Sequence, residues 1–157
     1  LPERLKRSTK HRRLTPTSRP VWQGCWSARS VVVVEVNGYT IEPGANLQQA
    51  NLQQANLAGA NLTEVNLQGA HLYEANFAEV NLTGAILQGA NLWMANLTGA
   101  NLTGANLWMA NLQGANLTGA NLTGANLTES VLEGAIANED TIWPEGVDPV
   151  AAGVIFV

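Results

Sequence analysis

The chain has 157 residues, of which 13% are charged, 6% are aromatic and 46% are apolar. This length suits one compact domain, the charge is too low for a typical charged disordered chain, and the aromatic residues are too few for an ordinary mixed core. Cys25 is the only cysteine, which excludes a disulfide framework or a multi-cysteine metal site within one chain. No apolar run approaches the ~20 residues of a membrane helix, so we expect no membrane span.

Residues 1–29 carry all eight basic residues of the chain against the single acidic Glu3, which gives this segment a net charge of +7. It also contains Pro2, Pro16 and Pro20 and has no steady helical or strand period. We therefore predict a disordered basic arm that is a solvated tail. The alternatives are binding to an anionic surface, such as nucleic acid or lipid headgroups, and a role as a targeting segment.

Residues 30–44 are predicted to form an N-terminal cap. The apolar run Val31–Val36 indicates a strand, and Asn37-Gly38 followed by Tyr39-Thr40-Ile41 indicates a turn and a return. The exposed end of a stack of strands must be covered, and this segment can cover the first layer of the residues after it.

Residues 45–134 are eighteen consecutive pentapeptides without an insertion. The central residue, here called position i, is Leu in all but one repeat, where it is Phe77. Position i−2 is Ala with the exceptions Val65, Val80 and Ser130, and position i−1 is Asn with the exceptions His71, Ile86 and Val131. Position i+2 is most often Gly, and position i+1 is variable and mostly polar.

A period of five fits neither a helix nor a flat strand. Leu at every fifth position of an α-helix would rotate by about 140° each time and leave no single apolar stripe. On a flat strand, i−2 and i share a face, but the next i−2 lies on the other face. The chain must therefore turn a corner in every repeat and stack its coils as a β-solenoid. Spacings of 15 between Trp93-Met94 and Trp108-Met109, and of 20 between Tyr73 and Trp93, leave three or four repeats per coil open.

The runs Ala-Asn-Leu-Thr-Gly, Ala-Asn-Leu-Gln-Gly and Ala-Asn-Leu-Trp-Met resemble the A(D/N)LXX signature of the pentapeptide repeat family. The resemblance implies an all-β fold, a right-handed quadrilateral β-helix with four repeats per coil. Eighteen repeats then give about four and a half coils, or five if a degenerate coil comes after them.

Residues 135–157 are predicted to complete that last coil and to cap it. Ala137 and Ile142 keep the register of position i after Leu132, and Trp143-Pro144 with the apolar tail Val150–Val157 indicate a cap. The tail is also a candidate homodimer contact, because the solenoid ends pair in some members of the family that the chain resembles.

Catalytic and metal-binding patterns are missing from the repeats. They contain His71 and Ser130 but no Cys, Lys, Arg or Asp, and the recurring glycines are explained by the corners. We expect no enzymatic activity, no cofactor and no metal site.

The outward positions carry any binding specificity. With four repeats per coil, residues 20 apart stack, which places Tyr73 beside Trp93 with Met94 next to them and Trp108-Met109 round one corner. Tyr, Trp and Met are enriched in interface cores, so these five residues are the candidate partner-binding site.

The sequence predicts a rigid scaffold that binds a protein partner it does not identify. The alternative, implied by the resemblance, is mimicry of duplex DNA toward DNA gyrase or topoisomerase, which the neutral Asn at i−1 and the few carboxylates disfavour. A third hypothesis is ice binding by the Thr column Thr63, Thr83, Thr103 and Thr123. We expect no direct nucleic-acid binding apart from the basic arm, and a bacterial, cytoplasmic location.

Deletion of residues 1–29 is predicted to leave the melting temperature nearly unchanged, because the arm is expected to pack on nothing. Thermal unfolding of the full and shortened chains measures this. A large drop in the melting temperature, or strong protease resistance of the arm, would contradict the prediction.

Overall fold

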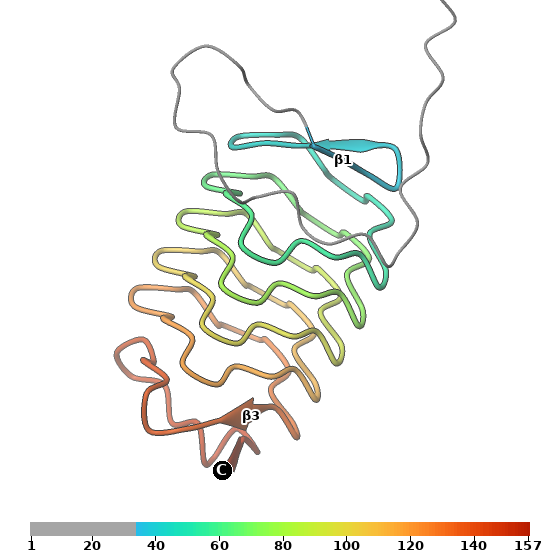
Figure 1. The fold of residues 1–157 in the computed structure, drawn as a ribbon. Helices are drawn as coiled ribbons and strands as arrows, with labels where there is room; N and C mark the ends of the chain where they lie inside the picture. Colours follow the sequence, from blue (N-terminus) through green and yellow to red (C-terminus); the bar gives the residue numbers. More distant parts are fainter. Residues whose placement is uncertain (1–33) are drawn as a thin grey trace, which may run out of the picture.

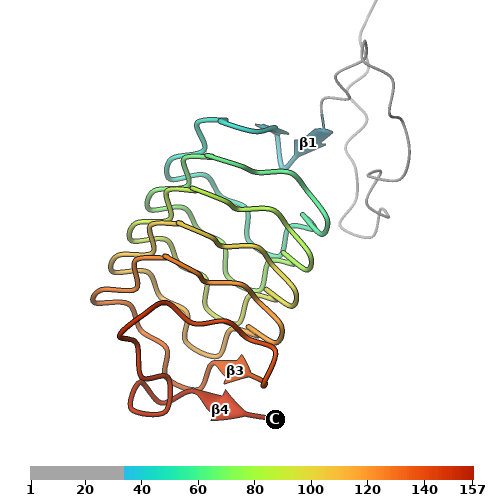
Figure 2. The ribbon, with the colours of Figure 1, turned by 90° about the vertical axis from the view of Figure 1, so that its left-hand side faces the viewer.

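The computed structural model describes residues 34–157, so the predicted basic arm at residues 1–29 lies outside the described part. The described residues form a four-sided tower of stacked coils in which no segment is helical. In Figure 1 the coils descend from β1 (Val34–Val36) at one end to β3 (Ile136–Ala137) at the other. Figure 2 shows the same stack after a quarter turn, with β4 (Ile155–Phe156) beside β3 at the C-terminal end.

Parallel backbone pairs join each coil to the next. Every pair from Asn46 with Asn66 to Asn116 with Ile136 joins residues 20 apart, so one coil contains four repeats. In the first rung, the Leu47 N–H donates to the Asn66 carbonyl oxygen over 2.7 Å, and the Asn66 N–H donates to that of Ala45 over 2.9 Å. The backbone pairing thus shows four repeats per coil, whereas the spacing of the aromatic residues in the sequence left three or four open.

The four repeats of a coil make the four sides of the tower, which we number by their central residues. Side 1 is centred on Leu47, Leu67, Leu87, Leu107 and Leu127, and side 2 on Leu52, Leu72, Leu92, Leu112 and Leu132. Side 3 is centred on Leu57, Phe77, Leu97 and Leu117, and side 4 on Leu62, Leu82, Leu102 and Leu122.

The interior is filled by the side chains at i and i−2. The central Leu or Phe77 is buried in every repeat, and the residue at i−2 is buried in all repeats except the first and the last, where Ala45 and Ser130 are half-buried. Each buried Leu contributes roughly 1.5–3 kcal/mol relative to an exposed one. The inward assignment of i and i−2 is confirmed.

Each corner is a tight turn from the central residue to the next Ala. The Ala50 N–H, for example, donates to the Leu47 carbonyl oxygen over 3.1 Å. The residue at i+2 has a positive φ in these turns, such as 65° at Gly89 and 54° at Met94. Glycine adopts this conformation without a steric penalty, which explains its prevalence at i+2.

The N-terminal end is covered by a two-stranded hairpin. β1 pairs antiparallel with β2 (Tyr39–Ile41), and Asn37 and Gly38 between them both have positive φ, as a type I′ turn requires. The Tyr39 hydroxyl accepts a hydrogen bond from the Asn51 N–H over 3.2 Å, and Ile41 is buried. This hairpin lies within residues 30–44, the segment predicted as the N-terminal cap, of which Val31, Val32 and Val33 lie outside the described residues.

The C-terminal end departs from the predicted register. Ala137 is buried as expected, but Ile142 is 51% exposed and pairs with Asn121, 21 residues away, so it occupies i−1 and not i. The reason is one additional residue in the corner, which now runs from Asn138 to Thr141. Buried Thr141 compensates by donating its hydroxyl to the Leu117 carbonyl oxygen over 2.9 Å.

The tail closes the tower with one more rung. β3 pairs in parallel with β4, and Val154 just before β4 is buried. Ile155, Phe156 and Val157 are exposed on this last rung. The tail therefore adds a last pair of strands at the C-terminal end and presents apolar side chains to the outside.

Replacement of Leu97, which is 0% exposed in the middle of the tower, should be costly. Leu97→Ala is expected to lower the free energy of unfolding by about 2–5 kcal/mol, because the close-packed stack cannot fill the cavity. Chemical denaturation measures this, with exposed Gln113→Ala as the control. Equal stability of the two variants would contradict the inward assignment of Leu97.

Candidate interaction surface

The asparagines at i−1 fix the direction of the outward side chains at i+1. The Asn91 carboxamide oxygen, for example, accepts from the Trp93 N–H over 3.1 Å, and Asn106 does the same for Trp108 over 3.2 Å. Asparagine commonly bonds the backbone two residues ahead and so stabilises a local turn. This bond holds the backbone at i+1 in every repeat with Asn at i−1, whereas Tyr73, two residues after His71, has no such asparagine.

Exposed apolar side chains within the repeats gather on two adjacent sides. The five large ones that are exposed are Ile86, Trp93, Met94, Met109 and Val131, and all five belong to repeats of side 1 or side 2. Sides 3 and 4 present only Ala and Thr at i+1 within the repeats. The distribution of apolar residues is therefore uneven around the tower.

Tyr73 and Trp93 form an aromatic pair on side 2. Their ring centroids lie 6.5 Å apart and their planes make an angle of 63°, which is an edge-to-face arrangement. They stand on neighbouring coils, joined nearby where the Glu74 N–H donates to the Trp93 carbonyl oxygen over 2.9 Å. Trp93 is 38% exposed and Tyr73 is half-buried. The stacking predicted from their 20-residue spacing is confirmed.

Met94 lies at the corner next to Trp93. It is 52% exposed, and its side chain extends over the next coil, where a methyl group placed on Gly114 would come within 3.3 Å of the Met94 Cγ. Gly114 therefore leaves room for the Met94 side chain and meets the positive φ of its own corner. Met94 therefore adds an exposed apolar side chain at the corner next to the aromatic pair.

Trp108 and Met109 lie one coil further along, on side 1. Trp108 is half-buried on that side, and Met109, which is 53% exposed, occupies the corner that leads into side 2. The structure thus brings Tyr73, Trp93 and Met94 together on side 2 and places Trp108 round the corner from them. We call these five residues the aromatic surface.

Two exposed apolar residues were not among the predicted site residues. Ile86 lies on side 1, where it pairs with Asn106 on the coil that carries Trp108, and Val131 lies on side 2. Both replace the Asn that is usual at i−1. This replacement is the sequence signal that could have identified them.

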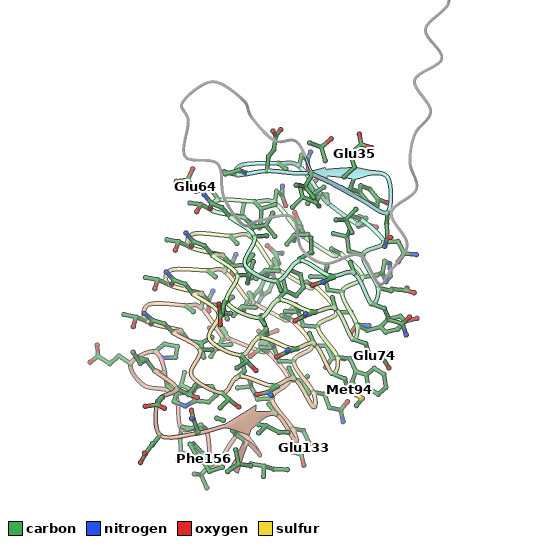
Figure 3. The ribbon with its side chains drawn as sticks, in the orientation of Figure 1. Glu35, Glu64, Glu74, Met94, Glu133 and Phe156 are labelled. Carbon is green, nitrogen blue, oxygen red and sulfur yellow. The ribbon has the colours of Figure 1, made fainter. Side chains whose placement is uncertain are left out.

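Acidic side chains border the aromatic surface. Figure 3 shows Glu74, Met94 and Glu133 along one edge of the tower and Glu64 on the opposite edge. Glu74 accepts a hydrogen bond from the Gln54 amide nitrogen over 2.8 Å, and Glu133 is exposed two coils beyond Trp93. Residues 34–157 contain no Lys or Arg, so the permanent charges near side 2 are negative.

The threonines of side 4 use their hydroxyl groups within the rung. Thr63, Thr83, Thr103 and Thr123 each donate to the carboxamide oxygen of the Asn two residues before, over 2.6 Å. The column predicted from the sequence is therefore present, with hydroxyl protons directed at the protein and not at solvent.

Residues 34–157 show no grouping of three or more His, Cys, Asp or Glu side chains that could hold a metal ion. His71 is exposed on side 2, as predicted for its position at i−1. In the part of the chain that the structure covers, no helix has the length and apolar character to cross a membrane.

Comparison with known proteins identifies the repeats. The model of the family described as pentapeptide repeats matches residues 44–77, 60–92, 75–107 and 95–134. A pentapeptide repeat protein from Nostoc Pcc 7120 is 37% identical, with a TM-score of 0.50 over 68% of this chain and 84% of that one. One from the thylakoid lumen of Arabidopsis thaliana is 33% identical, with a TM-score of 0.49 over 59% of this chain and 61% of that one.

A more distant structure is QnrB1, a plasmid-mediated fluoroquinolone resistance protein. It is 18% identical, with a TM-score of 0.56 over 71% of this chain and 65% of that one, which shows a likeness of fold alone. The comparison with curated proteins found no match. The fold class predicted from the sequence, a right-handed quadrilateral β-helix, is confirmed by the family match.

The outward position of Trp93 and Trp108 predicts that their loss is tolerated by the fold. Replacing both with Thr, which many sister repeats carry at i+1, should change the free energy of unfolding by no more than about 1 kcal/mol, as for ordinary surface substitutions. Thermal and denaturant unfolding of the double variant measure this. Destabilisation comparable to that of Leu97→Ala would show that the indole rings are part of the core.

Proposed function

Because the chain belongs to the pentapeptide repeat family, we propose that it is a non-catalytic scaffold that binds another protein through the aromatic surface. The observation that carries the proposal is the collection of exposed apolar side chains on two adjacent sides, with Tyr73 and Trp93 in edge-to-face contact. Aromatic residues and Met are enriched in the cores of protein interfaces, whereas a surface under no such demand has scattered single apolar residues.

The rigidity of the tower supports the same function. The backbone around Trp93 is bonded to the coils on both sides, since the Asn91 N–H donates to Ala70 and the Leu92 N–H donates to Asn111, over 2.9 and 2.8 Å. A partner that binds such a surface does not have to order the backbone beneath it. Preorganisation of this kind raises affinity because less conformational entropy is lost on binding.

DNA mimicry toward gyrase or topoisomerase is the second candidate, and the charges argue against it. Such mimicry needs dense rows of carboxylates in place of phosphates. The repeats contain only Glu64, Glu74, Glu79, Glu129 and Glu133, and these five residues are spread over all four sides. The likeness to QnrB1 supports the fold and adds nothing to this function.

Ice binding by the column of Thr63, Thr83, Thr103 and Thr123 is the weakest of the three candidates. A regular Thr column on a stiff solenoid supports it. The hydroxyl groups, however, already donate to neighbouring asparagines, and side 4 offers a single such column.

A homodimer through the C-terminal tail is a separate proposal. It is supported by the exposed apolar side chains of Ile155, Phe156 and Val157 on the last rung, where β4 has a partner strand on one side only within the described residues. We also propose a bacterial, cytoplasmic protein. The Nostoc relative supports the bacterial source, while the relative from a thylakoid lumen represents the alternative compartment.

Capture of the partner from a native lysate tests the scaffold function. The full chain and the double variant Trp93→Thr with Trp108→Thr are used as baits, and the captured proteins are quantified by mass spectrometry. We expect a specific protein to be lost from the variant by a factor of about thirty or more, as for the loss of interface anchors.

A matched variant on sides 3 and 4 controls for effects of surface substitution that do not depend on the aromatic surface. Thr98→Ala with Thr123→Ala alters two i+1 positions on sides 3 and 4 and should capture the same proteins as the parent chain. If the double Trp variant also captures the same proteins, the aromatic surface is not the binding site. Loss of a partner only after neutralisation of the five repeat glutamates would favour DNA mimicry.

A further inference from the structure

The charges around the aromatic surface restrict the chemistry of its partner. Glu74 lies at the corner of side 2 beside Tyr73, Glu133 lies on side 2 itself, and Glu129 lies at the corner between sides 1 and 2. Lys and Arg are absent from residues 34–157, so no fixed positive charge in them offsets these carboxylates. The local potential therefore favours a cationic partner over a neutral or an anionic one.

The aromatic pair adds a second attraction for a cation. The face of an indole or phenol ring attracts a positive charge, and Trp is the most effective ring. Trp93 is 38% exposed, and its ring centroid lies 6.5 Å from that of Tyr73. An arginine fits this site better than a lysine, because its planar guanidinium group stacks on aromatic rings and is more weakly hydrated.

The apolar neighbours suit the rest of an arginine side chain. Met94 at one corner of side 2 and Met109 at the other are both about half exposed. Methionine is flexible and adapts to the shape of a partner, and the methylene stem of an arginine packs well on such a surface.

We propose that the partner segment bound by side 2 is an extended, arginine-bearing peptide with one guanidinium group on Trp93 and others near Glu74 and Glu133. This inference rests on the proposed scaffold function and specifies the partner's chemistry. Glu74 and Glu133 are three coils apart, which at ~4.8 Å per rung is about 14 Å, or about four extended residues. The segment therefore carries three basic residues within a stretch of about six.

The same charges oppose two other occupants. Nucleic acid would bring phosphates toward Glu74, Glu129 and Glu133. A second copy that docks side 2 against side 2 would bring the same glutamates together, and like charges in an interface are unfavourable.

Binding of a labelled peptide to the full chain tests the proposal. The probe is a synthetic peptide of alternating Arg and Gly, and its control is the same peptide with citrulline, which keeps the shape of arginine but is neutral. Fluorescence anisotropy should show weaker binding of the citrulline peptide by about tenfold or more, and Trp93→Thr should weaken binding of the arginine peptide by about tenfold.

Two pairs of charge variants distinguish binding at side 2 from non-specific electrostatic attraction of the arginine peptide to the whole chain. Glu74→Gln with Glu133→Gln should weaken binding of the arginine peptide about fivefold, while Glu64→Gln with Glu79→Gln, on sides 4 and 3, should change it less than twofold. Both pairs remove two negative charges. Equal losses in the two pairs, equal binding of the citrulline peptide, or no binding of the arginine peptide would overturn the proposal.

The lysate capture distinguishes this failure from failure of the scaffold function. Suppose that the double Trp variant fails to capture a partner, and that the arginine peptide does not displace this partner from the parent chain. The scaffold function then holds, and the proposal of an arginine-bearing partner segment is wrong. If the double Trp variant loses no partner, the scaffold function itself is wrong. Displacement of the captured partner by the arginine peptide, and not by its citrulline analogue, supports both.

Discussion

The structure depends on one constraint, which is that the backbone must bond to the next coil while every repeat points two side chains inward. Hydrogen bonds such as Leu97 N–H to Asn116 oxygen, 2.8 Å, form only if the chain returns to the same place after 20 residues. The Leu and Ala side chains then fill the interior at the same height in every coil. Burial and backbone pairing therefore require the same geometry, and a repeat that satisfies one satisfies the other.

This constraint leaves only some positions free to vary. Burial restricts position i to Leu or Phe. Position i−1 is mostly Asn, because its side chain accepts a hydrogen bond from the backbone N–H of i+1, as Asn91 does from Trp93. Position i+2 must accept a positive φ, and Met94 and Met109 accept it where most repeats have Gly. A non-glycine residue in this conformation has an energetic cost, which eight of the eighteen repeats accept at i+2, Met94 and Met109 among them.

Most of the fold could be predicted from the sequence because the repeat encodes local geometry directly. The period predicts the inward positions and the corners, whereas it leaves the number of repeats per coil open, because spacings of 15 and 20 both occur among the aromatic residues. The predicted register of Ile142 was wrong because the corner before it contains one more residue, which the pairing of Ile142 with Asn121 and the bond from Thr141 to Leu117 reveal. The site residues were identifiable as outward, and the replacement of Asn at i−1 could have identified Ile86, but the edge-to-face contact of Tyr73 and Trp93 required the structure.

The central claim is that one half of the tower surface, sides 1 and 2, meets a partner while the other half remains in solvent. Hydroxyl-radical footprinting of the captured complex, compared with the free chain, tests this most directly because Trp and Met side chains react readily when exposed. We predict that Trp93, Met94 and Met109 become protected in the complex, while Phe156 at the far end keeps its reactivity. Unchanged oxidation of Trp93 and Met94, with protection confined to Phe156, would contradict the claim and place the interface at the C-terminal end of the solenoid.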